Sequence, residues 1–104
     1  MACYAIGHIG VTDPDRYMEY AKAVLAQVQA VGGRVLAAGA AAQVEGPPLP
    51  NQNIVIEFPD EDTAMAWYRS DEYQAIKPVR LGASSSSQIA LVQGWRGAET
   101  TVSH

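Results

Sequence analysis

Glycine and proline divide this chain into short segments, and this punctuation restricts the possible folds more than any other feature of the sequence. The stretch "TDPD" at 12–15 follows the first apolar run, and "GG" at 32–33 stops the next segment. The stretch "GPPLP" at 46–50 lacks three backbone donors. No apolar run approaches the roughly 18 to 20 residues that cross a bilayer. The sequence therefore predicts a fold built from several short strands and helices.

The first third of the chain predicts a strand followed by a helix. Residues 3–11, "CYAIGHIGV", suit a strand, and Thr12 or Asp13 can cap a helix that has Pro14 in its first turn. Larger apolar residues then recur at helical spacing on one stripe, and Gly32 and Gly33 end the helix. That stripe consists of Tyr17, Ala21, Val24, Leu25, Val28 and Val31.

Two further strands are predicted in the middle of the chain. Residues 34–45 are rich in alanine, but Gly39 and the preceding glycine pair favour an extended segment. Its length exceeds the mean strand of about 5 to 6 residues, so we expect a bulge or bend near Gly39. A proline-rich loop at 46–52 then leads to "NIVIEF" at 53–58, the clearest strand of the sequence.

The last part predicts two short helices and a fourth strand. Asp60 can cap a helix from Glu61 to about Arg69, and Ser70 can cap a second one. Pro78 should kink or end that helix and Gly82 should close it. The run "SSSS" at 84–87 predicts a polar turn into a strand at 88–95.

The resulting order β-α-β-β-α-β is the ferredoxin-like arrangement, an α+β fold with a four-stranded antiparallel sheet. Residues 1–96 should form one domain, and 97–104 should be a mobile tail. The strands do not alternate cleanly, because Val55 shares a face with Glu57 while Ile54, Ile56 and Phe58 occupy the other. Two largely apolar faces and helices for only one of them predict a homodimer.

Charge and cysteine content exclude several classes of function. The net charge of −4 disfavours nucleic-acid binding, and neither a signal peptide nor a membrane anchor is expected. The single cysteine, Cys3, permits no internal disulfide, so a cytoplasmic location is the simplest expectation. Metal-ligand spacings, a phosphate-binding loop and a dinucleotide fingerprint are absent, which predicts no cofactor and no metal.

Three residues are candidates for catalysis. Glu57 lies in an apolar strand, where a carboxylate must be paired or neutral, and a neutral one could serve as an acid or base. The alternative is a structural ion pair with Arg80 or Arg34, which we favour. Arg80 could orient an anionic group, although pairing with an acid of its own subunit is the simpler expectation. His8 could transfer a proton near neutral pH, but a lone strand histidine is more often a packing residue.

A second set of side chains could bind a ligand. Trp67, Tyr68 and Tyr73 could line an aromatic pocket for a planar molecule, with Tyr17 and Arg34 as further candidates. At helical spacing the same aromatic residues are first of all core residues. Two hypotheses follow: a dimeric module that binds a small apolar or aromatic molecule, and a cofactor-independent monooxygenase-like or isomerase-like enzyme that uses proton transfer.

Several motifs together resemble the DUF1330 family of uncharacterised proteins. They are "VTDPDRYMEYAKAV", "GGRVLAAG", "VEG", "IVIEFPDEDTAMAWYRSDEYQA" and Arg80, in order across about residues 4–94. That family is similar to the dimeric α/β-barrel superfamily, so the resemblance implies two ferredoxin-like subunits with their sheets face to face. Ala38 and Asn53 stand where many relatives carry arginine, which weakens any anion-binding role shared through those positions.

Overall fold

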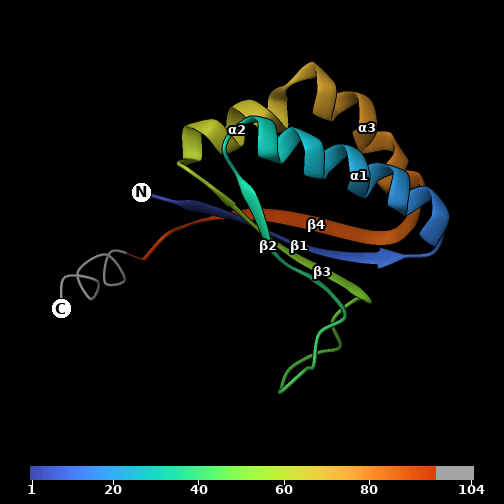
Figure 1. Cartoon of the computed structure of the whole chain (residues 1–104). Helices are drawn as coiled ribbons and strands as arrows, with labels where there is room; N and C mark the ends of the chain where they lie inside the picture. The colour runs from blue at the N-terminus through green and yellow to red at the C-terminus, as the bar shows by residue number, and fades with distance from the viewer. Residues whose placement is uncertain (96–104) are drawn as a thin grey trace.

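We describe residues 1–95 in a computed structural model, so the prediction of a mobile tail at 97–104 lies outside the described residues. The strands and helices follow in the order predicted, with the second helical segment divided in two (Figure 1). They are β1 (Cys3–Val11), α1 (Pro14–Ala30), β2 (Arg34–Gly39), β3 (Gln52–Phe58), α2 (Glu61–Arg69), α3 (Asp71–Gly82) and β4 (Ser84–Gln93). The predicted α+β class is confirmed.

Side-chain caps start the helices where the sequence predicts them. Asp13 accepts a hydrogen bond from the Arg16 backbone N–H, and Asp60 accepts one from that of Thr63 at 2.7 Å. Ser70 accepts one from the Tyr73 backbone N–H at 3.2 Å and thereby separates α3 from α2. Pro78 does not end α3, which continues to Gly82. Each cap satisfies an otherwise unpaired backbone donor, so the ends of the helices are set locally.

The four strands form one antiparallel sheet in the order β2-β3-β1-β4, and all three helices lie on one side of it (Figure 1). Burial alternates along β1: Cys3, Ala5, Gly7 and Ile9 are buried toward the helices, while the residues that alternate with them are half-buried. We call the side away from the helices the open face. The register places these residues on it: Tyr4, Ile6, His8, Asn53, Val55, Glu57, Ala90 and Val92.

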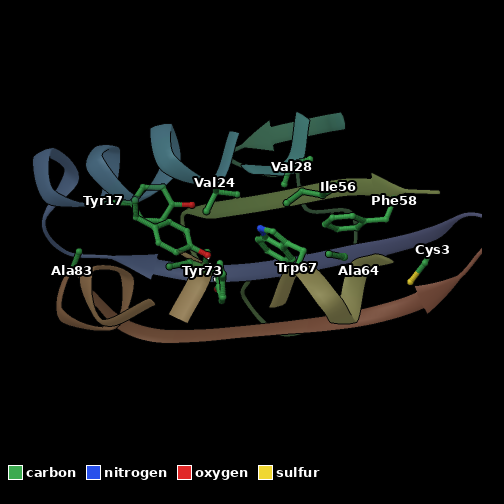
Figure 2. Packing of buried hydrophobic residues seen from close by; sticks show 13 residues of the cluster. Cys3, Tyr17, Val24, Val28, Ile56, Phe58, Ala64, Trp67, Tyr73 and Ala83 are labelled. Carbon is green, nitrogen blue, oxygen red and sulfur yellow. Dashed lines mark hydrogen bonds between the residues drawn. The ribbon is translucent and has the colours of Figure 1, made fainter. Parts of the chain in front are cut away.

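The core lies between the helices and the sheet and is largely aromatic. Figure 2 shows Tyr17 and Tyr73 at one end, Trp67 near the middle and Phe58 toward the other end. The Trp67 ring centroid lies 4.4 Å from that of Tyr73 and 5.2 Å from that of Phe58. A chain whose apolar content is dominated by alanine thus relies on these rings to fill its interior.

Three details of the sequence prediction are wrong. Leu25 and Val31 belong to the predicted apolar stripe of α1 but are exposed, because the buried stripe follows Tyr17, Tyr20, Val24 and Val28. The extended segment ends at Gly39, and its bulge lies earlier, between Val35 and Ala37. Residues 84–87 are not a turn but the beginning of β4, where they pair with the end of β1.

Candidate functional site

A cavity of about 330 Å³ opens between α2, α3 and the edge strand β4. Its walls are mostly apolar and aromatic, and Arg80 is the one charged residue among them. The lining residues are Met65, Trp67, Tyr68, Arg80, Leu81, Ser87, Gln88, Ile89 and Leu91. Small-molecule sites commonly occupy roughly 300 to 1,000 Å³, so this cavity can hold a small ligand.

The break between α2 and α3 positions two walls of this cavity. Ser70 ends α2 by donating its hydroxyl proton to the Trp67 carbonyl at 2.6 Å, and it also caps α3. Trp67 and Tyr68 come from the last turns of α2, whereas Arg80 comes from the last turn of α3. The third wall is β4, where Ser87, Ile89 and Leu91 alternate along the side that faces the helices.

The aromatic wall is well ordered by its neighbours. Trp67 is 4% exposed, and its indole Nε1–H donates to Gln27 Oε1 at 3.1 Å. The Tyr68 ring centroid lies 5.2 Å from that of Tyr73, and its hydroxyl oxygen accepts a hydrogen bond from Lys77 Nζ at 2.8 Å. These contacts fix the rings before any ligand arrives, which reduces the entropy lost on binding.

Arg80 is 4% exposed and lies next to the hydroxyl-bearing side chains of Tyr20 and Ser87. Its guanidinium carbon lies 5.7 Å from the Tyr20 ring centroid, and Nη1 donates a long hydrogen bond of 3.4 Å to Ser87 Oγ. Tyr20 and Tyr73 share a hydrogen bond of 2.8 Å between their hydroxyls. Burial and the neighbouring Tyr73 raise the pKa of Tyr20 well above its ordinary value, although the Arg80 charge opposes this shift. Tyr20 therefore offers Arg80 no negative charge at neutral pH.

Glu57 lies on the open face, away from this cavity. Its Oε1 accepts from Arg34 Nε at 2.8 Å and its Oε2 accepts from the Tyr4 hydroxyl at 3.2 Å. That hydrogen bond raises the pKa of Tyr4. The predicted ion pair of Glu57 therefore exists, and its partner is Arg34 rather than Arg80.

His8 also lies on the open face, where it is paired across the strands with Asn53. Its Nδ1 lies 2.7 Å from Asn53 Oδ1, so the ring is hydrogen bonded as a packing histidine would be. A shallow hollow of about 390 Å³ lies beside it, between the prolines of the β2–β3 loop and residues 86–88 of β4.

The structure thus separates the candidate residues into two groups. Trp67, Tyr68 and Arg80 line one cavity, and Tyr73 packs directly behind them. Tyr17 belongs to the core beside Tyr20, with ring centroids 5.7 Å apart. Glu57, His8 and Arg34 lie on the other side of the sheet, so Glu57 and His8 do not meet Arg80.

Sequence reasoning missed the contribution of β4 to the cavity. Ser87 and Gln88 were expected at a turn and its exit, yet they line the cavity wall. The signal was present, because Ser87, Ile89 and Leu91 share a two-residue period that extends the strand backward into the serine run. The serines concealed it, since a polar cluster is typical of a turn.

Within residues 1–95, no helix is long and apolar enough to cross a membrane. In the same part of the chain, no group of three histidine, cysteine or acidic side chains comes together in a way that could hold a metal ion.

The fold and this cavity define a ferredoxin-like α+β protein with a ligand-sized pocket on the helix side of the edge strand β4. Residues 2–95 match the family model described as a domain of unknown function, DUF1330. The chain belongs to the DUF1330 family, as its motifs predict. No curated protein sequence matches the chain.

Several solved structures share the fold. A protein of unknown function from Rhodopseudomonas palustris is 16% identical, with a TM-score of 0.72 over 91% of this chain and 83% of that one. A dimeric ferredoxin-like protein of unknown function from Jannaschia sp. CCS1 is 11% identical, with a TM-score of 0.73 over 90% and 100%. A protein from Nitrosomonas europaea, whose proposed activity is that of an antibiotic biosynthesis monooxygenase, is 13% identical, with a TM-score of 0.59 over 91% of each chain. At these identities the likeness establishes the fold alone.

Proposed function

We propose that this protein is a homodimer that binds one small apolar or aromatic molecule in each subunit, in the cavity between α2, α3 and β4. The observation that carries this proposal is the cavity itself, because ring and aliphatic side chains provide most of its surface. Trp67 and Tyr68 offer flat surfaces for a planar ligand, while Leu81, Ile89 and Leu91 offer aliphatic contact.

The interior beneath α1 is a poor alternative for a ligand. The space enclosed there by Tyr17, Tyr20, Val24 and the facing strands is about 20 Å³, close to the roughly 10 to 15 Å³ that one water needs. A ligand of even one ring would have to displace the core. The cavity at β4 is more than ten times larger and needs no such rearrangement.

The dimer is proposed from the open face. Ile6 on the central strand β1 is flanked by Val55 and Ala90, and Val92 beside them is 47% exposed. An apolar strip with no helix over it is favourable only when a second molecule covers it. The dimeric state of the Jannaschia protein with the same fold supports this arrangement.

An enzyme that works by proton transfer, like a cofactor-independent monooxygenase or isomerase, has less support. The two groups suited to moving a proton, Glu57 and His8, are engaged by Arg34, Tyr4 and Asn53. They also lie across the sheet from the cavity and Arg80. A substrate in the cavity would reach neither of them without crossing the sheet.

Ligand binding can be tested by NMR with single-ring probes in matched pairs: benzoate with benzamide, and phenylacetate with phenylacetamide. We expect at least one probe to shift the Met65 methyl signal and the Trp67 indole N–H signal saturably. Met65→Trp should weaken this binding by filling the cavity, whereas Met18→Trp on the exposed side of α1 should leave it unchanged. The proposal is rejected if no probe gives a saturable shift at Met65 or Trp67.

A further inference from the structure

Arg80 is the single buried charged residue within the described part of the chain. It belongs to the last turn of α3, where the helix dipole favours a positive charge. Its guanidinium reaches the cavity wall between Tyr20 and Ser87. Because Arg80 is only 4% exposed and lines the cavity, its charge faces the cavity rather than the solvent.

The positive charge of Arg80 has no negative partner among residues 1–95. Arginine stays protonated in proteins, so burial cannot remove the charge. The single ion pair in this part of the chain joins Arg34 to Glu57 on the open face. A buried cation without an anion is unfavourable, since it has lost its hydration without regaining it elsewhere. The charge of Arg80 therefore needs a counter-ion that is not a side chain of residues 1–95.

Arg80 also lacks hydrogen-bond acceptors. Its Nε is buried and has no hydrogen-bond partner, and the bond from Nη1 to Ser87 Oγ is long at 3.4 Å. Nε and one terminal nitrogen form the side of the guanidinium that binds a carboxylate through two parallel hydrogen bonds. The Ser87 hydroxyl accepts from Arg80 and keeps its own proton for donation to an anion.

The remaining walls of the cavity restrict the class of anion. None of the lining residues is acidic, although acidic side chains outnumber basic ones 11 to 7 in the chain. The single positive charge of Arg80 matches a ligand with one negative charge, whereas a phosphate dianion would need a second basic residue, which these walls lack. The other lining groups are mainly apolar or aromatic, which favours a hydrocarbon body attached to the anionic group.

We infer that the molecule bound in this cavity is a small monocarboxylate with an aromatic or apolar body, and that Arg80 and Ser87 bind its carboxylate. This inference rests on the proposed function and specifies its ligand. The carboxylate accepts from the Arg80 guanidinium and the Ser87 hydroxyl, while the body packs between Trp67, Leu81 and Leu91. Binding thereby supplies both the missing counter-charge and the missing acceptor.

A structural role for Arg80 without any ligand is the competing explanation. The ring of Tyr20 provides a cation–π contact, which offsets part of the cost of burial. That contact does not satisfy Nε, because a ring face below the guanidinium leaves the in-plane donors free. A purely structural Arg80 would also show no preference between a charged probe and its neutral counterpart.

The test compares benzoate with benzamide, and phenylacetate with phenylacetamide, on wild type and variants by NMR titration. We expect wild type to bind each carboxylate about ten-fold or more tightly than its amide, from charge-assisted hydrogen bonds. Arg80→Met should abolish this preference, so that each carboxylate binds no more tightly than its amide. Arg69→Met, which removes an exposed arginine from the end of α2, is the matched control and should keep the preference.

A second readout uses the wild-type protein, in which the buried charge of Arg80 is retained. The Arg80 Nε–H signal of wild type, assigned by its loss in Arg80→Lys, should shift on addition of benzoate and stay in place with benzamide. Equal binding of acids and amides, with no movement of that signal, would overturn the monocarboxylate inference and leave the proposed function standing. Equal competition by inorganic phosphate would overturn it as well. Absence of binding by all four probes would reject the proposed function itself.

Discussion

Arg34 and Glu57 occupy directly paired positions of β2 and β3, and their side chains meet on the open face with Arg34 Nε 2.8 Å from Glu57 Oε1. The Arg34 side chain is 71% exposed and that of Glu57 is 25% exposed. The sequence left open whether Glu57 is a buried anion or a neutral acid. The structure shows the ion pair with Arg34 and places it at the margin of the sheet, because β2 is an edge strand.

Removal of the Glu57 charge should therefore have a small effect. We expect Glu57→Gln to lower the free energy of unfolding by no more than about 1 kcal/mol, as for other solvent-exposed ion pairs. Urea unfolding of wild type, Glu57→Gln, Arg34→Met and the double variant would give the coupling energy directly. A loss of several kcal/mol would contradict this expectation and would mean that the carboxylate is sealed from water.

The open face gives a prediction about assembly. Ile6 lies at its centre, paired with Val55 on one side and Ala90 on the other. We expect wild type to sediment at twice 11.1 kDa at micromolar concentration, and Ile6→Asp to sediment at 11.1 kDa because a charge cannot be buried in that contact. Met18→Asp, on the exposed side of α1, should remain dimeric. A wild-type protein that stays monomeric would eliminate the face-to-face arrangement.

Much of the fold could be predicted because its signals are local. The caps at Asp13, Asp60 and Ser70 depend on one side chain and a backbone N–H three residues later, so their sequence positions suffice. The strand at 53–58 is recognisable from its own β-branched residues. The exposed position of Leu25 was not predictable in the same way, since it depends on how far α1 rotates over the sheet.

The candidate site was only partly predictable because it depends on contacts between distant segments. The aromatic residues of α2 and Arg80 could be named as candidates from their types. Arg80 meets Ser87 rather than Glu57 because Ser87 lies on the side of the sheet that faces the helices, whereas Glu57 lies on the open face. The counter-charge of an arginine is a question of tertiary structure, and here the expectation of an acidic partner within its own subunit is not met among residues 1–95.

The buried tyrosine pair gives a prediction about pH. Burial and Tyr73 raise the pKa of Tyr20, and the opposing charge of Arg80 does not cancel this shift; Tyr17 faces the same ring. An unfolded tyrosine ionises near about pH 10, while folded Tyr20 still holds its proton there. Unfolding then releases a proton, so the stability contributed by neutral Tyr20 is complete below about pH 10 and declines as the pH rises further.

Tyr20→Phe isolates this contribution. The variant loses the hydrogen bond to Tyr73, which should lower the free energy of unfolding at neutral pH by about 0.5 to 1.5 kcal/mol. Its stability should then decline less steeply than that of wild type between about pH 9 and about pH 11, as measured by urea unfolding. Parallel profiles for the two proteins would show that Tyr20 ionises as freely in the folded state as in the unfolded one.

The two tryptophans of the chain provide a matched test of the core. Trp67 is 4% exposed and packs against Phe58 and Tyr73, whereas Trp95 is 74% exposed beyond the end of β4. Trp67→Ala removes a large ring from a filled interior, so we expect a loss of about 3 to 5 kcal/mol in the free energy of unfolding. Trp95→Ala should change it by no more than about 0.5 kcal/mol, because few contacts are removed.

Trp67 also forms one wall of the cavity, so the size of the stability change in Trp67→Ala is informative. Its ring contacts the core on one side and the cavity on the other, so truncation enlarges an existing space as well as creating a new one. If Trp67→Ala costs less than about 1 kcal/mol, the indole contributes to the ligand pocket rather than to folding. A loss in the expected range, together with unchanged stability of Trp95→Ala, would establish that the Trp67 side chain closes the core.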